Sequence, residues 1–225
     1  MSILSCRNLV KEYAVGSEQF TALDKVSIEI DKGEYLAVTG ESGSGKTTLL
    51  NLLGLIDKPT SGEIIIKGKN VLADVKDPSS LRNTFFGYVF QNFYLEPNYT
   101  AFYNIEIPMI ISGIPAKERK PRVDEALKKV GLINKADVKC GKLSGGEKQR
   151  ICIARAIINE PTVVLADEPC GNLDSANTES IMNLFDELNK SGTTIILVTH
   201  SHEEALRANK MIKMKDGKII EIESN

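Results

Sequence analysis

Residues Gly40 to Thr47 read GESGSGKT and match the phosphate-binding loop pattern G-x-x-x-x-G-K-S/T at every fixed position. Glycines let the backbone curl so that successive N–H groups point inward, and the N-terminus of the following helix adds partial positive charge. The apolar run Tyr35 to Thr39 predicts a buried strand before the loop, and Thr48 to Leu53 predicts a helix after it. Because a phosphate-binding loop requires this setting, the stretch predicts a nucleotide site in an α/β fold.

The candidate nucleotide-binding residues begin with this loop. A triphosphate carries dense negative charge, and we expect Lys46 to reach its β- and γ-phosphates. The hydroxyl of Thr47 is expected to bind Mg²⁺. The full set at the loop is Gly40, Glu41, Ser42, Gly43, Ser44, Gly45, Lys46, Thr47 and Thr48.

Composition predicts an ordinary globular protein. The chain has 225 residues, 42% hydrophobic and 26% charged, which is enough for one large α/β domain. Its net charge of −2 gives no reason to expect a nucleic-acid partner. No apolar run approaches the ~20 residues that a membrane span needs, and the first residues lack the apolar stretch of a secretory signal. We therefore expect a cytoplasmic location, with other chains supplying any membrane spans.

The cysteines give no sign of a metal site. Cys6, Cys140, Cys152 and Cys170 are scattered, without the spacing of zinc ligands. We expect reduced, partly buried thiols, as is usual in a cytosolic protein.

Hydrophobic periodicity predicts two sets of strands. Short runs predict an antiparallel sheet beside the nucleotide core, at residues 3–9, 26–30 and 63–67. Continuous apolar runs predict buried strands at residues 35–39, 86–90, 162–166 and 194–198. Asp216-Gly217 lies between two alternating runs and predicts a hairpin near the end of the chain.

Helices are predicted between the buried strands. They cover the residues after the loop to about Ile56, then 80–84, 117–130, 147–158, 177–190 and 203–208. Residues 92–138 contain no run typical of a buried strand, and we interpret this segment as a helical insertion. Its early aromatic residues fit either core filling or a docking surface.

Polar side chains follow the buried strands at the end of each one. Gln91, Asp167, Glu168 and His200 occupy these positions. In an open parallel α/β sheet, ligands bind outside the carboxyl ends of the strands. These residues are therefore predicted to converge with the glycine loop on one nucleotide.

Each converging residue has a predicted role and a simpler alternative. Asp167 is expected to hold Mg²⁺ opposite the loop threonine, and Glu168 to polarise the attacking water. Gln91 is expected to reach a metal-bound water, and His200 to hydrogen-bond the γ-phosphate. The alternatives are a turn cap for Asp167, solvent-facing polar groups for Glu168 and Gln91, and a structural role for His200. His202 has no comparable support and is interpreted as a surface residue.

A second motif, Leu143 to Arg150, reads LSGGEKQR. A Ser-Gly-Gly turn that opens a helix is another potential anion-binding site. One triphosphate does not need two such sites in one chain. We therefore expect a head-to-tail pair of chains, in which the turn of one chain closes over the nucleotide of the other.

The motifs in this order resemble the ATP-binding-cassette (ABC) ATPases, whose signature is LSGGQ-x-QR. The resemblance covers nearly the whole chain and implies a RecA-like P-loop NTPase core, an antiparallel β-subdomain and an inserted α-helical subdomain. It implies a single domain over residues 1–225, with about 1–90 and 160–225 forming the core and β-subdomain. Residues of about 92–158 would form the helical subdomain.

The resemblance also implies ATP and Mg²⁺ as cofactors and a homodimer that binds two ATP molecules at its interface. Tyr13 falls where the family stacks an aromatic ring on adenine, and Asp174 ends the loop that crosses the dimer interface. Glu168 would be the general base, with Lys46 and His200 stabilising phosphoryl charge; Thr47, Asp167 and Gln91 would serve the metal. The signature residues implied in nucleotide binding are Ser144, Gly145, Gly146 and Glu147.

Two further stretches narrow the resemblance. EP-x-GNLDS after Glu168, and FGYVFQNF-x-L around Gln91, resemble the branch that contains lipoprotein-release, macrolide-export and antimicrobial-peptide-resistance ATPases. That branch implies an integral-membrane permease as partner and a peripheral position on the inner face of the cell membrane. The sequence departs from the usual pattern at Glu147, Cys170, Ser201 and Leu95-Glu-Pro97.

Three alternatives remain. A soluble ABC ATPase acting on DNA or ribosomes would carry a long coiled coil between Thr47 and Leu143, or a second cassette, and neither pattern is visible. A P-loop kinase or GTPase would not need LSGGEKQR. A cell-division ATPase of similar sequence stays possible within the transporter class.

Overall fold

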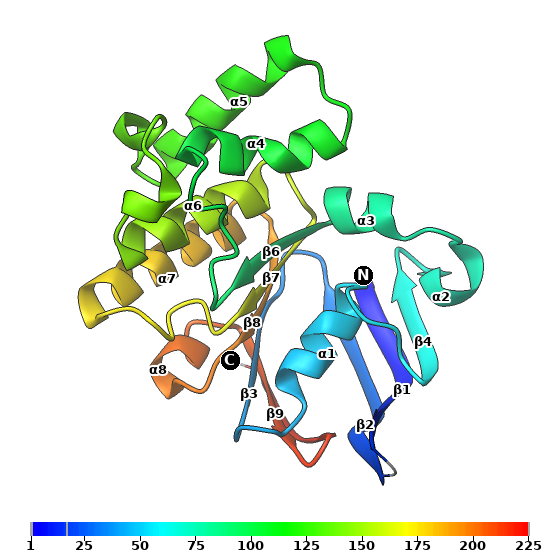
Figure 1. Cartoon of the computed structure of the whole chain (residues 1–225). Coiled ribbons are helices and arrows are strands. Elements are labelled where there is room, and N and C mark those ends of the chain that lie inside the picture. The colour runs from blue at the N-terminus through cyan, green and yellow to red at the C-terminus, as the bar shows by residue number, and fades with distance from the viewer. Residues whose placement is uncertain (1, 17, 225) are drawn as a thin grey trace.

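The structure is a computed structural model that describes residues 2–16 and 18–224. Figure 1 shows a central sheet, a second sheet beside it with a helix between the two, and a group of helices on the far side of the central sheet. The predicted single domain, residues 1–225, includes residues 1, 17 and 225, which lie outside the described part. The predicted division at about residues 92 and 158 stays a prediction.

The central sheet has the strand order β10-β9-β3-β8-β7-β6. Neighbours from β9 to β6 are parallel, and β10 is antiparallel to β9. The strands are β3 (Tyr35–Gly40), β6 (Phe86–Phe90), β7 (Val163–Asp167), β8 (Thr194–Val198), β9 (Lys210–Lys215) and β10 (Lys218–Ser224).

The register of this sheet aligns the strand ends that carry the candidate site. Val38 pairs with Val198, Val198 with Asp167, and Asp167 with Phe90. These residues lie next to one another in a row across the sheet. The residues that follow this row therefore emerge at one edge, and they include Glu168 and Gln91.

The second sheet is antiparallel and has the order β2-β1-β4-β5. Its strands are β1 (Ser2–Val15), β2 (Glu18–Asp31), β4 (Ser61–Ile66) and β5 (Lys69–Asn70). β1 and β2 are longer than the predicted strands at 3–9 and 26–30. Hydrophobic alternation marks only the packed half of this hairpin; the other half is exposed and held by backbone pairing, as between Tyr13 and Phe20.

Helix α1 (Lys46–Leu53) begins at the glycine loop and lies between the two sheets (Figure 1). The short helices α2 (Val71–Asp74) and α3 (Ser79–Thr84) lead into β6. The helical group contains α4 (Ala101–Ile111), α5 (Ala116–Lys129) and α6 (Gly145–Ile157), followed by α7 (Ser175–Lys190) and α8 (His202–Ala205). None of the helices in the described part is long and apolar enough to cross a membrane.

The sheet separates two hydrophobic cores because successive side chains of a strand point to opposite faces. In β8, Ile195 and Leu197 pack on the side of helices α4 to α7. The intervening Ile196 and the terminal Val198 pack with α1 and the second sheet. Burial on both faces explains why the central strands read as continuous apolar runs.

Several predicted helices differ from the structure; α8, for example, ends at Ala205 rather than at residue 208. The helix after the loop ends at Leu53 rather than near Ile56, since Leu55 takes a left-handed φ of 59° and turns the chain. Helix α4 lies in the aromatic, proline-containing segment and was not predicted as a separate helix. Thr100 is its N-cap, and Pro108 lies within it. The predicted terminal hairpin is confirmed, and both Asp216 and Gly217 have the positive φ of a two-residue turn.

Asn104 gives a test of how the helical group is held. It is fully buried, and its amide joins the backbone at Glu96 and Thr100 at 2.8 to 3.1 Å. Asn104→Ala is expected to lower the free energy of unfolding by about 2 kcal/mol, because buried backbone groups lose their partner. Urea denaturation measures this change, with the exposed Asn98→Ala as the matched control. Equal stability of the two variants would contradict the role of the buried amide.

Candidate functional site

The glycine loop lies where the two sheets meet. At Gly40, where φ is 142°, a Cβ would collide with the Met214 carbonyl of β9. At Gly45, where φ is 101°, a Cβ would lie 2.6 Å from the Ala22 carbonyl of β2. The backbones of β9 and β2 therefore leave no room for a Cβ in the loop, and only glycine fits these two positions.

The loop lysine lies inside the curl of its own backbone. Lys46 is 7% exposed, and its Nζ donates hydrogen bonds to the carbonyls of Gly40 at 2.9 Å and Glu41 at 2.8 Å. Ser44 Oγ is buried in the same loop without a hydrogen-bond partner in the described part of the chain. A buried cation and an unsatisfied hydroxyl are the groups that would bind phosphate oxygens, so the loop fits a triphosphate.

Thr47 and Asp167 lie together at the predicted metal position. The Thr47 hydroxyl donates to Asp167 Oδ1 at 3.2 Å, which joins α1 to the end of β7. Burial raises the pKa of the Asp167 carboxyl, and the neighbouring Glu168 charge raises it further, whereas Thr47 and Lys46 lower it. An added divalent cation would favour the charged carboxylate, and hydroxyl and carboxylate oxygens are suitable ligands. The donor set fits Mg²⁺.

Glu168 and His200 form a second pair at the same edge. Glu168 has a left-handed φ of 44°, and its N–H donates to the Val198 carbonyl at 2.9 Å. Its Oε2 lies 3.3 Å from His200 Nδ1. The histidine side chain is 67% exposed and the glutamate 26%, so both reach solvent beside the loop. A carboxylate in this position can accept a proton from water.

Gln91 lies at the same edge but outside these contacts. It follows β6, and its amide packs against Gly171, where an added Cβ would lie 2.8 Å from Nε2. Its carbonyl accepts a hydrogen bond from Asn172 at 3.4 Å. Among the described residues its side chain forms no hydrogen bond with Thr47 or Asp167. Its metal role stays a prediction.

Ser144 opens α6 through a capping box. Its Oγ accepts a hydrogen bond from the Glu147 N–H at 3.3 Å, and its own N–H donates to Glu147 Oε2 at 2.9 Å. Glu147 Oε1 pairs with Lys135 at 3.0 Å, and the hydrogen bond from the Ser144 backbone is the main cause that lowers the pKa of Glu147. The unusual glutamate therefore serves its own helix terminus, and its contact with nucleotide stays a prediction.

The signature turn lies beside the predicted interface loop. A Cβ at Gly146 would collide with the Asn177 side chain, and a Cβ at Gly145 would lie 3.6 Å from Leu173. Asp174 caps α7 by accepting from the Asn177 N–H at 2.8 Å. In residues 2–16 and 18–224, no hydrogen bond or ion pair joins Ser144–Glu147 to the loop Gly40–Thr47. The structure therefore brings the predicted residues together in two separate groups.

Tyr13 lies on the exposed end of β1 and is 37% exposed. Its hydroxyl donates to Asp57 Oδ2 at 3.0 Å. Burial is the main cause that raises the pKa of Tyr13, while Thr48 on α1 is close enough to its hydroxyl to lower that pKa. The ring therefore lies near the helix that opens at the glycine loop.

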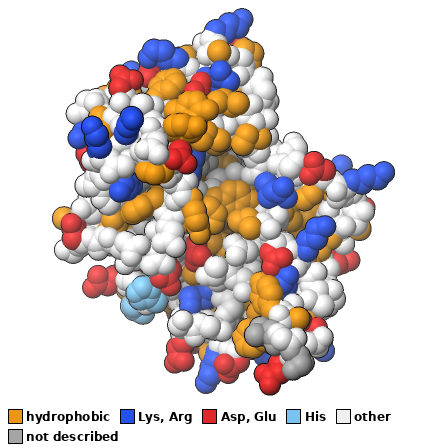
Figure 2. Space-filling model, viewed as in Figure 1, with side chains coloured by type: hydrophobic (Ala, Val, Ile, Leu, Met, Phe, Trp, Pro, Cys, Tyr) orange, Lys and Arg blue, Asp and Glu red, His pale blue; other side chains and the backbone are white. Residues whose placement is uncertain are grey.

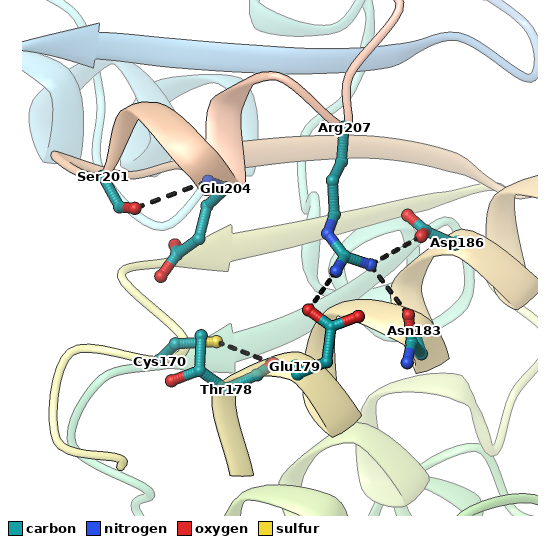
Figure 3. A network of polar contacts seen from close by, with 8 residues as sticks. All are labelled: Cys170, Thr178, Glu179, Asn183, Asp186, Ser201, Glu204 and Arg207. Carbon is teal, nitrogen blue, oxygen red and sulfur yellow. Dashed lines mark hydrogen bonds and ion pairs between the residues drawn. The ribbon is translucent and has the colours of Figure 1, made fainter. Parts of the chain in front are cut away.

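Sequence reasoning missed a polar network between Arg207 and helix α7. Figure 3 shows Arg207, after α8, reaching three side chains of α7. Its guanidinium pairs with Glu179, and bonds Asn183 and Asp186 at 2.8 Å. No motif marks Arg207, because only the packing of α8 against α7 gives it partners.

Cys170 lies in the same region, between Glu168 and α7. Its thiol is buried and points to the Thr178 carbonyl (Figure 3). Burial raises the pKa of Cys170 to about 12. The thiol is therefore neutral and unreactive. The other three cysteines are also free, and all four are buried rather than partly buried as predicted.

Two hollows flank the candidate site. One, of about 490 Å³, lies between the loop and β9–β10; Glu41, His200, His202 and Lys213 contribute to its lining. The other, of about 280 Å³, lies under α3 and α4 and is lined partly by Tyr88, Phe90, Tyr94, Pro108 and Arg155. Figure 2 shows a hollow with hydrophobic side chains between the two halves of this face.

The chain is similar in sequence to proteins of a known family. The family model described as ABC transporter matches residues 23–171. The chain is 46% identical over 202 residues to LolD of Aquifex aeolicus, the ATP-binding protein of a lipoprotein-releasing system, with 89% of this chain and 90% of LolD covered. It is 42% identical over 224 residues to MacB of Hyphomonas neptunium, a macrolide export ATP-binding/permease protein, covering 99% of this chain but 35% of MacB.

Solved structures confirm the fold. The dimeric structure of MJ0796, a bacterial ABC transporter cassette, has a TM-score of 0.91 and 39% identity over 98% of both chains. A second MJ0796 structure, a dimeric post-hydrolysis state bound to ADP and Pi, has a TM-score of 0.90. The predicted P-loop core with an antiparallel β-subdomain and a helical subdomain is therefore confirmed. This chain belongs to the ABC transporter family, as an ATP-binding and ATP-hydrolysing cassette.

Proposed function

We propose that this protein powers a separate integral-membrane permease by hydrolysing Mg-ATP between two copies of itself. The observation that carries the proposal is the meeting of two pairs at one sheet edge. Thr47 lies 3.2 Å from Asp167, and Glu168 lies 3.3 Å from His200. The oxygen atoms that can bind a cation, and the carboxylate that can take a proton from water, thus lie beside a loop that fits phosphates.

Nucleotide binding rearranges the loop lysine. Lys46 exchanges the Gly40 and Glu41 carbonyls for phosphate oxygens, and Ser44 gains the partner that its buried hydroxyl lacks. Thr47 and Asp167 would hold Mg²⁺, which neutralises phosphate charge when bound. Tyr13 provides a flat surface for the base.

Glu168 acts as the general base for the attacking water. Its carboxylate is one residue beyond Asp167, and backbone bonding to Val198 fixes where it leaves the sheet. His200 orients that carboxylate and stabilises developing γ-phosphate charge together with Lys46. Gln91 completes the metal environment from the neighbouring strand end.

The residues of the signature turn are proposed to act on the nucleotide of a partner chain. Ser144, Gly145 and Gly146 open a helix N-terminus that binds no group of its own glycine loop, and such a terminus attracts anions. In a head-to-tail dimer, this turn and Asp174 face the nucleotide held by the other copy. The MJ0796 structures are described as dimeric, which supports a pair of chains.

The hollow under α3 and α4 is proposed as the contact with the permease. Its lining is aromatic and polar, and it includes Tyr94, which is 68% exposed and could be covered by a partner. The Phe93 to Tyr103 segment, next to Gln91, would pass nucleotide-driven motion to that contact. The protein would thus lie in the cytoplasm, peripheral on the inner face of the cell membrane.

The proposed cargo class is a lipoprotein, macrolide or antimicrobial peptide, moved by export or extraction. LolD and MacB support it, because their descriptions name lipoprotein release and macrolide export. MacB is described as both ATP-binding protein and permease, and this chain matches about a third of it. LolD, 90% of which is covered, is described as the ATP-binding protein of its system, and this supports a permease that is a separate chain.

Glu168→Gln is expected to lower the ATP turnover number about a hundredfold or more, because the amide cannot take the proton from water. ATP affinity should stay within about twofold, because the loop and the metal residues are unchanged. Phosphate release and equilibrium binding of a fluorescent ATP analogue measure the two effects. Glu203→Gln, at an exposed position on α8, is the matched control. Normal turnover in Glu168→Gln would exclude the role as base.

ATP is expected to convert Glu168→Gln protein from monomers to dimers, because the nucleotide joins the loop of one chain to the Ser144 turn of the other. Adding Ser144→Arg should abolish this dimer while leaving ATP affinity nearly unchanged, because bulk at the turn blocks only the partner. Light scattering with and without Mg-ATP measures the mass. Dimers that persist in the double variant would place the interface elsewhere.

A further inference from the structure

Tyr13 is held more firmly than is usual for an exposed side chain. The ring lies outside both hydrophobic cores, yet it is held at two points. Its hydroxyl donates to Asp57 Oδ2 at 3.0 Å, and Lys11 Nζ lies 4.7 Å from the ring centroid, over one face. The ring therefore has a fixed orientation and one covered face.

Lys11 and Asp57 are bound to each other as well. Lys11 Nζ lies 2.9 Å from Asp57 and 2.7 Å from the Lys58 carbonyl, and the lysine side chain is only 12% exposed. Burial raises the pKa of Asp57, but hydrogen bonds from Lys11, the Lys58 N–H and Tyr13 together outweigh burial and lower that pKa. The lysine of this pair is largely shielded from water, and the Asp57 side chain is 35% exposed, so the contact keeps its geometry better than a fully solvated ion pair does.

The contacts with Lys11 and Asp57 also connect the Tyr13 ring to the helix that follows the glycine loop. Asp57 lies in the turn after α1, the helix that begins at Lys46, and its N–H bonds the Asn51 carbonyl of that helix. Thr60 of the same turn accepts from the Glu12 N–H at 2.9 Å and donates to the Val10 carbonyl at 2.8 Å. The exposed end of β1 is thereby held in register with the helix that binds phosphates.

We propose that Lys11 and Asp57 are positioning residues that hold the Tyr13 ring for the base of the bound nucleotide. The ammonium occupies one face of the ring, and the opposite face receives the base. The inference rests on the proposed function, in which ATP binds at the loop and stacks on Tyr13. Holding the ring in advance removes an ordering cost from binding. Stacking reads the flat face of a base and not its edge, so ATP and GTP should be affected alike.

The test compares nucleotides, whose base can stack on Tyr13, with a triphosphate that carries no nucleobase. Lys11→Met and Asp57→Ala are made in the Glu168→Gln protein, and binding of ATP, GTP and inorganic tripolyphosphate is measured by calorimetry with Mg²⁺. ATP and GTP should each bind about three- to tenfold more weakly, because the ring is no longer held. Tripolyphosphate binding should not change, because it contacts only the loop.

Three further variants serve as controls. Lys58→Met, at the exposed neighbouring lysine, should bind all three ligands normally. Lys11→Arg keeps a cation over the ring and should restore ATP affinity. Tyr13→Phe removes only the hydroxyl of an exposed ring, so it tests the tether even if Asp57→Ala does not fold. It should weaken ATP and GTP but not tripolyphosphate.

The outcomes separate the inference from the proposed function. If Tyr13→Ala binds ATP normally, base stacking at Tyr13 is wrong and the proposed site fails there. If Tyr13→Ala weakens ATP but Lys11→Met, Asp57→Ala and Tyr13→Phe do not, stacking survives and the positioning role is overturned. Equal weakening of ATP and tripolyphosphate would also overturn it, because the pair would then support only the loop.

Discussion

The site depends on the parallel register of three neighbouring strands. Pairing of Val38 with Val198, and of Val198 with Asp167, brings the ends of β3, β8 and β7 to one level. That alignment places Asp167 within 3.2 Å of Thr47, although 120 positions separate them in the chain. Parallel strands buried on both faces cannot slip without exposing their apolar side chains, so the two hydrophobic cores hold this geometry.

The same sheet separates parts that act together only across two chains. The glycine loop and α1 lie on one side with the second sheet, whereas α6 and its signature turn belong to the helical group (Figure 1). The Ser144 turn is complete as a helix terminus and packs beside Asp174. A helix terminus that makes no contact with its own glycine loop fits the proposed use of this turn on a second copy.

Sequence motifs and hydrophobic periodicity predicted much of this structure. The loop and the strand ends are local patterns, and the apolar runs marked every strand of the central sheet from β3 to β8. Residues such as Arg207, Lys11 and Asp57 escaped notice because each gains its role from a partner far along the chain. Helix α4 escaped because prolines and aromatics obscure its period.

By itself the sequence determined the fold class, the loop and the candidate chemistry, because glycine spacing and apolar runs act over a few residues. Tertiary structure alone decided that Glu147 pairs with Lys135, that Cys170 is buried and neutral, and that Tyr13 is held by Asp57. The physical reason is range: backbone geometry and hydrophobic period are local, whereas hydrogen bonds, burial and ion pairs depend on which distant segments the packing brings together.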